Sequence, residues 1–135
     1  MHLSDSARRF LEERRFAVLA TIGEGGLPQQ TVMWYELRGD TIVMNTRAGR
    51  AKDKFLRRDP RCSVCVADGY DFVTITGTIR MIEDQAVAQE DIRRLAIRYD
   101  GEESAERQVR DAFSKQQRIT LHLPIEHVIT HGLDQ

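Results

Sequence analysis

The pattern of apolar and polar positions in the first half of the chain predicts a short helix followed by a β-meander. Residues 4–15 repeat their apolar side chains at helical spacing, and a serine, Ser4 or Ser6, stands where it can cap the helix start. The segments after this helix are rich in β-branched and other apolar residues, which favours strands, and they are separated by glycine-containing turns. The predicted strands are residues 16–22, 29–37 and 41–46, with turns at 23–28 and 38–40.

The second half mixes helical and strand periodicity. Residues 50–58 have helical spacing, and the helix is expected to end before Pro60, because the residue before a proline disfavours the α region. Gly77 interrupts an alternating run and indicates a bulge or bend, as at a barrel corner. Further strands are predicted at residues 61–67, 71–82, 118–123 and 127–130, and helices at 84–99 (with Val87, Ile92, Leu95, Ala96 and Tyr99 inward) and 103–116. Six or seven antiparallel strands with helices between them predict a mainly β fold, a small barrel.

Composition narrows the class of protein. A chain of 135 residues with 41% hydrophobic and 30% charged side chains is expected to form one globular domain, spanning residues 1–135. It contains no apolar run near the roughly 20 residues that cross a bilayer. Its first residues lack the apolar centre of a signal peptide, so we expect a cytoplasmic protein without membrane contact.

Charge is concentrated in one stretch of the chain. Residues 47–61 carry seven Lys and Arg side chains against two Asp, whereas the chain as a whole has a net charge of −1. Within this stretch, residues 46–52 lie between a predicted strand end and a predicted helix start, where backbone N–H groups and the helix dipole favour an anion. We therefore predict a phosphate pocket there. A solvated basic helix face remains the alternative interpretation.

Three other motifs have simpler structural explanations. Cys62 and Cys65 are three apart in a predicted strand and so point to opposite faces, which favours two structural thiols over a redox or zinc pair. The glycine turn at 23–26 leads into a strand, so it does not fit a dinucleotide fingerprint. The histidines on the terminal strands are not arranged as convergent ligands, so no metal site is predicted.

Several short motifs occur in one order along nearly the whole chain. They are residues 16–22, Gly26-x-Pro28, residues 32–35, Asn45-Thr46, Arg50-Ala51-Lys52, residues 56–61, Gly77 and residues 119–121. In their order and spacing the chain resembles the pyridoxamine 5'-phosphate oxidase-like, FMN-binding split-barrel superfamily. It is most similar to the branch that uses the deazaflavin coenzyme F-420.

The resemblance implies a split β-barrel homodimer with two cofactor sites at the subunit interface. In such proteins the second strand lays its backbone against the cofactor ring, and the third strand and basic loop hold the phosphate. The exposed rings expected for Trp34 and Tyr35 agree with a dimer. The implied ring contacts are Gln30, Thr31, Val32 and Met33, and the implied phosphate contacts are Asn45, Thr46, Arg50, Ala51 and Lys52.

The implied activity is an oxidoreductase that transfers a hydride from reduced coenzyme F-420 to an unsaturated or quinone-like small molecule. The alternatives are an FMN- or FAD-binding protein of the same fold and a non-enzymatic module that binds an anion or nucleic acid. Phe55 stands where family members often have Asn. No catalytic residue is assigned: the proton could come from Tyr35, Tyr70, an arginine or water. Coenzyme F-420 carries a polyglutamate tail, which favours additional cations beyond the phosphate site. The cations available for this tail are Arg47, Lys54, Arg57 and Arg58, and they favour the F-420 hypothesis over FMN or FAD.

Overall fold

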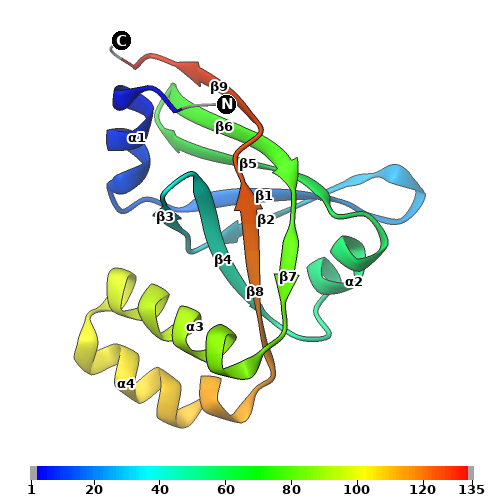
Figure 1. Ribbon diagram of the computed structural model, residues 1–135, viewed down its shortest axis with the longest axis vertical. Helices are drawn as coiled ribbons and strands as arrows, with labels where there is room; N and C mark the ends of the chain where they lie inside the picture. Colours follow the sequence, from blue (N-terminus) through cyan, green and yellow to red (C-terminus); the bar gives the residue numbers. More distant parts are fainter. Residues whose placement is uncertain (1–2, 134–135) are drawn as a thin grey trace.

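The chain folds into two antiparallel sheets that face each other, as the computed structural model of residues 3–133 shows (Figure 1). This is the mainly β fold predicted from the sequence, with nine strands among these residues in place of the expected six or seven. The five-stranded sheet has the order β2 (Pro28–Met33), β1 (Ala17–Ile22), β5 (Arg61–Asp68), β6 (Asp71–Thr78) and β9 (His127–His131). The four-stranded sheet has the order β3 (Glu36–Arg38), β4 (Thr41–Arg47), β8 (Arg118–Pro124) and β7 (Arg80–Ile82).

Two predicted strands are each divided between the sheets, which corrects the prediction of continuous strands at 29–37 and 71–82. The first breaks at residues 34–35, where Tyr35 donates its hydroxyl to Leu11 O at 2.8 Å and its backbone N–H to Tyr99 Oη at 3.1 Å. The second breaks at Ile79, whose N–H donates to Pro60 O at 2.8 Å. At these breaks, tertiary hydrogen bonds replace ladder bonds and direct the chain from one sheet to the other.

Close packing explains the glycine before the second break. A Cβ at Gly77 would lie 2.8 Å from Pro124 O, so only glycine lets β6 approach the end of β8 here. Gly77 itself pairs regularly with Cys62 in the β5–β6 register, so the bulge or bend predicted there is replaced by a close approach to β8, and the chain changes sheets two residues later, at Ile79.

The core between the sheets is apolar and includes Leu19, Ile75 and Leu121, all fully buried.

Helix α1 (Asp5–Glu12) packs against β3 and β6. Ser4 is its N-cap and accepts a hydrogen bond from Ala7 N at 3.1 Å, as the serine at this position predicts. The helix ends at Glu12 and not at residue 15. Helix α2 (Ala51–Arg58) follows β4 and ends, as predicted, before Pro60.

Helices α3 (Gln85–Asp100) and α4 (Glu102–Asp111) form a hairpin that lies beside β4 and β8 (Figure 1). The helix predicted at 103–116 stops at Asp111, and a 3-10 turn, η2 (Phe113–Lys115), follows it. Val87, predicted to face inward on α3, is 39% exposed, whereas Ile92 and Leu95 are buried as predicted. Within residues 3–133 no helix has both the length and the apolar character needed to span a bilayer.

The β1–β2 hairpin extends away from the rest of the molecule (Figure 1). At its tip is a 3-10 turn, η1 (Glu24–Gly26), and five of the six residues of β2 are exposed. The expectation that Tyr35 exposes its ring is wrong: Tyr35 is fully buried, because its hydroxyl and backbone are held inside the barrel. The exposed apolar area on this side comes from other residues, including Val32, which is 66% exposed.

Candidate functional site

The segment at residues 46–52 joins the end of β4 to the start of α2. Arg50 is the N-cap of α2 and makes no side-chain capping bond, so the first N–H groups of the helix lack an acceptor from a cap side chain. Gly49 has a φ of 89°, a left-handed conformation that glycine adopts without strain. The Asp53 carboxylate accepts from Gly49 N at 2.7 Å and from Arg57 Nε at 2.7 Å. This carboxylate therefore fixes the loop and is itself neutralised by Arg57.

Two cavities adjoin this segment and share the side chains of Arg50 and Lys52. The large cavity has a volume of about 300 Å³ and the small cavity about 260 Å³. The large cavity is lined by Val32, Met33, Trp34, Asn45, Thr46, Arg47, Arg50, Lys52, Ile92, Leu95, Phe113 and Arg118. The small cavity is lined by Thr21, Gln29, Gln30, Thr31, Arg50, Ala51, Lys52 and Phe55.

The lining of the large cavity is strongly basic. No Asp or Glu of the described chain lines either cavity. Four cations line the large one, and none of them forms an ion pair with a carboxylate in residues 3–133. We call this group the cavity cations: Arg47, Arg50, Lys52 and Arg118.

The fold brings these like charges close together, which lowers its stability. Arg47 and Arg118 are directly opposite each other in the β4–β8 register, an arrangement of like charges that destabilises a sheet. Partial burial, together with Arg50 and Arg118, lowers the pKa of Lys52. Burial, with Arg50 and Arg47, lowers the pKa of Arg118 to about 10. A bound anion would relieve this mutual repulsion.

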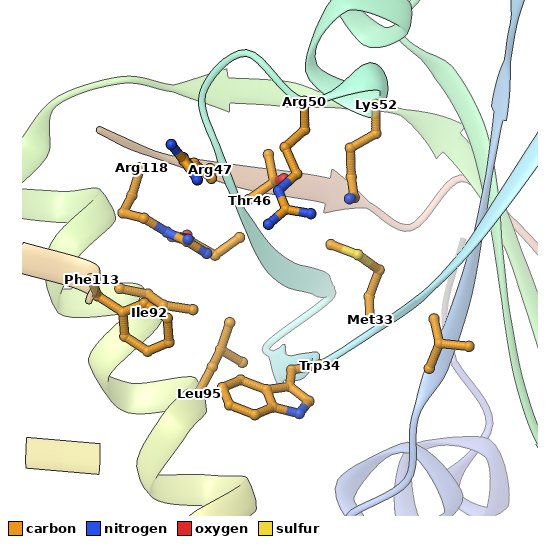
Figure 2. Close-up of a pocket in the computed structure, with 12 residues that line it drawn as sticks. Met33, Trp34, Thr46, Arg47, Arg50, Lys52, Ile92, Leu95, Phe113 and Arg118 are labelled. Atoms are coloured by element: carbon orange, nitrogen blue, oxygen red, sulfur yellow. Dashed lines mark hydrogen bonds between the residues drawn. The ribbon is translucent and has the colours of Figure 1, made fainter. Parts of the chain in front are cut away.

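The other wall of the large cavity is apolar (Figure 2). Trp34 stacks on Tyr99 with ring centroids 5.3 Å apart and an interplanar angle of 7°. Tyr99 is held in turn by its hydroxyl, which hydrogen-bonds to Arg15 O and to the backbone of Tyr35. Ile92, Leu95 and Phe113 complete the wall, facing the side chains of Arg50, Lys52 and Arg118 in Figure 2. The cavity thus places a rigid apolar surface opposite a set of cations.

All nine residues proposed from the sequence line one or both cavities. Val32, Met33, Asn45 and Thr46 line the large cavity, Gln30, Thr31 and Ala51 the small one, and Arg50 and Lys52 both. Phe55, at the position where Asn is frequent in the resembling proteins, lies in the small cavity.

Sequence reasoning missed one cation and most of the apolar wall. Arg118 is 8% exposed and comes from the start of β8, far along the chain from the basic loop. Its signal in the sequence is a charged residue at the start of a strand whose other residues alternate between apolar and polar. Ile92 and Leu95 were predicted to be buried, but their place in a cavity wall follows only from how α3 packs on β4 and β8.

The tyrosines considered as proton donors lie outside both linings. Tyr35 is buried in the barrel, where desolvation raises its pKa to about 12. Tyr70 is 90% exposed in the turn between β5 and β6. Within the large cavity, the side chains that carry exchangeable protons include Thr46, Lys52 and the arginines.

The two cysteines point to opposite faces of β5, as the strand pattern predicts. Cys62 is buried, and desolvation raises its pKa to about 12, which keeps the thiol protonated at neutral pH. Cys65 is partly exposed on the other face. Among residues 3–133 there is no group of three or more His, Cys, Asp or Glu side chains arranged to hold a metal ion.

Comparison with known proteins yields both a family and structural relatives. The family model described as pyridoxamine 5'-phosphate oxidase matches residues 3–131. A conserved hypothetical protein of Mycobacterium tuberculosis superposes with a TM-score of 0.80 at 25% identity, over 96% of this chain and 85% of that one. An F-420 reductase gives a TM-score of 0.76 at 18% identity, over 94% and 98% of the two chains. The heme storage protein HutZ of Vibrio cholerae gives 0.72 at 16% identity, over 98% and 97%.

Proposed function

The chain belongs to the pyridoxamine 5'-phosphate oxidase family, and from that membership we propose that it is an oxidoreductase using coenzyme F-420. It would pass a hydride from the reduced deazaflavin to an unsaturated or quinone-like small molecule. The observation that carries this proposal is the group of cavity cations, which face an apolar wall and have no carboxylate partner. The fold that the chain shares with an F-420 reductase supports the same proposal.

The residues of the large cavity fit a ligand with a phosphate and a flat ring. The cavity cations and the N-terminus of α2 offer charge-assisted hydrogen bonds to phosphate oxygens. Trp34, fixed by its stacking on Tyr99, offers a rigid surface to a ring and excludes water from one side. When bound, the coenzyme supplies the hydride, and the protein supplies binding and orientation.

A second candidate, an FMN- or FAD-dependent oxidoreductase, is favoured by one observation. Arg57, counted among the cations available for a polyglutamate tail, is bound by Asp53 and by Glu83 at 2.7 Å each. Its guanidinium is therefore already neutralised, which leaves Lys54 and Arg58 beyond the cavity cations for a long anionic tail. A shorter cofactor such as FMN needs no such contact.

The third candidate, an anion- or nucleic-acid-binding module, fits the geometry less well. Arg57 and Arg61 of the basic stretch are paired with Asp53 and Asp59, both from the same stretch. Of the unpaired cations in this stretch, Arg47, Arg50 and Lys52 converge on a cavity, and only Lys54 and Arg58 lie outside it. A concave, walled site suits a small anion better than a nucleic acid strand.

We also propose that two copies associate through the exposed side of the five-stranded sheet. Val32 on β2 and Ile129 on β9 are 66% and 63% exposed, and Leu27 beside β2 is 65% exposed. Val32 lines the large cavity as well, so a partner covering β2 would close that cavity from outside. Sedimentation of a stable monomer of 15.5 kDa at micromolar concentration would contradict this proposal.

Titration of the purified protein with coenzyme F-420, FMN and FAD, followed by fluorescence, tests the cofactor assignment. Lys52→Ala should weaken binding of the preferred cofactor about tenfold to a hundredfold, because one charge-assisted hydrogen bond to phosphate is lost. If Lys52→Ala binds every candidate as tightly as the parent protein, the phosphate lies elsewhere.

Lys54→Ala is the matched control, since Lys54 is exposed on the same helix and lines neither cavity. FMN binding should not respond to this change. Weaker binding of F-420 alone would indicate that Lys54 contacts the tail and would favour the first candidate.

A further inference from the structure

The side chain of Asn45 lines the large cavity, but its polar atoms are used inside the protein. Its Nδ2 donates to Ala88 O at 2.9 Å and to Thr120 Oγ1 at 3.4 Å, and its Oδ1 accepts from Arg118 Nε at 3.0 Å. Asn45 is 6% exposed. Both ends of the amide are thus occupied by described residues.

A chain of hydrogen bonds fixes the direction of this amide. Thr120 Oγ1 donates to Asp91 Oδ2 at 2.7 Å, so its lone pair is left to accept from Asn45. Asp91 is 4% exposed, and its other oxygen lies 2.8 Å from Arg38 Nη2. A flipped amide would turn its NH₂ group toward the Arg118 N–H and its oxygen toward Ala88 O. The network therefore specifies one orientation, with Oδ1 facing the guanidinium.

Arg118 is held on its other sides as well. Gln116 Oε1 accepts from Nη1 at 2.7 Å, and the guanidinium lies over the Phe113 ring at 5.0 Å from its centroid. Gln85 binds both the N–H and the C=O of Arg118, at 2.9 and 2.8 Å. None of these partners carries a negative charge.

Nearly complete burial makes this cation unusual. A buried guanidinium without a carboxylate is costly, and like charges nearby increase that cost. The side chain is nevertheless oriented by three neighbouring residues, Asn45, Gln116 and Phe113. It lines the large cavity together with Arg50 and Lys52 (Figure 2). Such preorganisation is typical of a group that meets an anionic ligand.

We propose that Arg118 is an anion-binding residue of the large cavity and that Asn45, backed by Thr120 and Asp91, positions its guanidinium instead of contacting the ligand. The anion is a phosphate or carboxylate group. This inference rests on the proposed function, because it assigns a further contact within the same site. It moves Asn45 from the ligand contacts that the family resemblance implies to a supporting position.

A comparison of FMN with riboflavin tests the contact of Arg118, because the two differ only in the phosphate. For a protein that prefers F-420, the pair is the coenzyme and its ring-and-ribityl fragment without phosphate. Arg118→Met should weaken binding of the phosphorylated ligand about tenfold to a hundredfold and leave the other within about twofold. An equal loss for both ligands would overturn the assignment, because it would indicate a damaged cavity wall.

A double-mutant cycle tests the role of Asn45. Asn45→Leu alone should lower the affinity for the phosphorylated ligand, whereas in the Arg118→Met background it should add no further loss. A further loss in that background would show that Asn45 contacts the ligand directly, and the proposal would fail.

Thr120→Val and Thr120→Ser keep the test valid if Asn45→Leu does not fold. Valine removes the hydroxyl that links Asp91 to Asn45, so it should reproduce the phosphate-specific loss, and serine should restore the affinity. Equal affinities for the two Thr120 variants would contradict the positioning role.

Failure of this inference can be told apart from failure of the proposed function. If Lys52→Ala weakens binding but Arg118→Met does not, the site is correct and only the role of Arg118 is wrong. If neither variant changes binding, the site itself is wrong.

Discussion

Cations occur in two settings in this molecule. Around the large cavity they have no carboxylate partner, whereas on α3 and α4 the arginines Arg93, Arg94, Arg107 and Arg110 each lie beside one. Each cation counts as +1 toward the formal charge of −1 in either setting, so the net charge of the chain does not reveal which cations are paired. Exposed pairs such as those on the helices contribute little to stability. The unpaired group is costly in the absence of a ligand, and that cost is the physical basis of the proposed binding function.

The largest effect should follow from removing two cavity cations together. The double variant Arg50→Ala/Lys52→Ala should weaken cofactor binding at least a hundredfold, since each contact is worth about 1.5–3 kcal/mol. Calorimetric titration measures the loss, and circular dichroism should show an unchanged fold. The loss of even one such contact should weaken binding more than about tenfold. A loss of less than about fivefold would therefore mean that the unpaired cavity cations bind the cofactor no better than the paired arginines of α3 and α4.

Within helix α2, Asp53 forms an ion pair with Arg57 but not with the cavity cation Lys52. Asp53→Ala should lower the free energy of unfolding by about 2 kcal/mol, because the charge-assisted bonds to Gly49 N and Arg57 are both lost. Urea denaturation measures this change. Asp53→Asn, which retains an acceptor for Gly49, should recover part of the stability, and no recovery would mean that the loop bond contributes nothing.

The pH dependence of stability should reveal the cost of burying Lys52. Its pKa is lowered in the folded protein, so just below pH 10.5 the unfolded chain binds more protons and stability rises with pH. Buried Cys62 and Tyr35, whose pKa values are raised, act in the opposite direction because the folded state retains their protons. The difference between the parent protein and Lys52→Met isolates the lysine. The advantage of the variant should therefore shrink as pH rises toward 10.5, and a constant difference would mean that Lys52 is not desolvated.

The smallest effect is expected on the outside of the helical hairpin. Arg93→Ala removes a cation that lies 3.0 Å from Glu106 and 3.5 Å from Glu90. Neither cofactor affinity nor the thermal midpoint should change measurably, because exposed pairs gain little in water. A clear loss of affinity would show that helix charges act on the cavity over distance.

The basic loop could be found in the sequence because its parts are contiguous. Thr46, Arg50 and Lys52 are separated by only a few residues at a strand-to-helix junction, which local patterns identify. Arg118 enters the same cavity through β4–β8 pairing, where it is opposite Arg47. No local pattern encodes that register, because it depends on the whole sheet.

The strand breaks were missed for a related reason. Residues 29–37 contain no glycine or proline that would mark a break, so the local sequence extends the strand through Tyr35. The break is specified by partners far along the chain, Leu11 and Tyr99, which bind the hydroxyl and the backbone of Tyr35. The same contacts bury the ring that was expected to be exposed. The local sequence therefore predicts which segments extend, and tertiary hydrogen bonds decide where they turn.

We expect the sparse packing of α4 to shorten the time that a ligand of the large cavity stays bound. Only one of its residues, Ala105, is buried, and the helix packs on α3 and η2. Phe113, in the turn just after α4, forms part of the wall of the large cavity. Its backbone carbonyl accepts a hydrogen bond from Gln89 Nε2 at 2.8 Å. A helix with so little buried area opens by local unfolding before the sheets do, and its amides should exchange hydrogen for deuterium first. Each opening would loosen the Phe113 wall, so the local stability of α4 would set the residence time of the ligand.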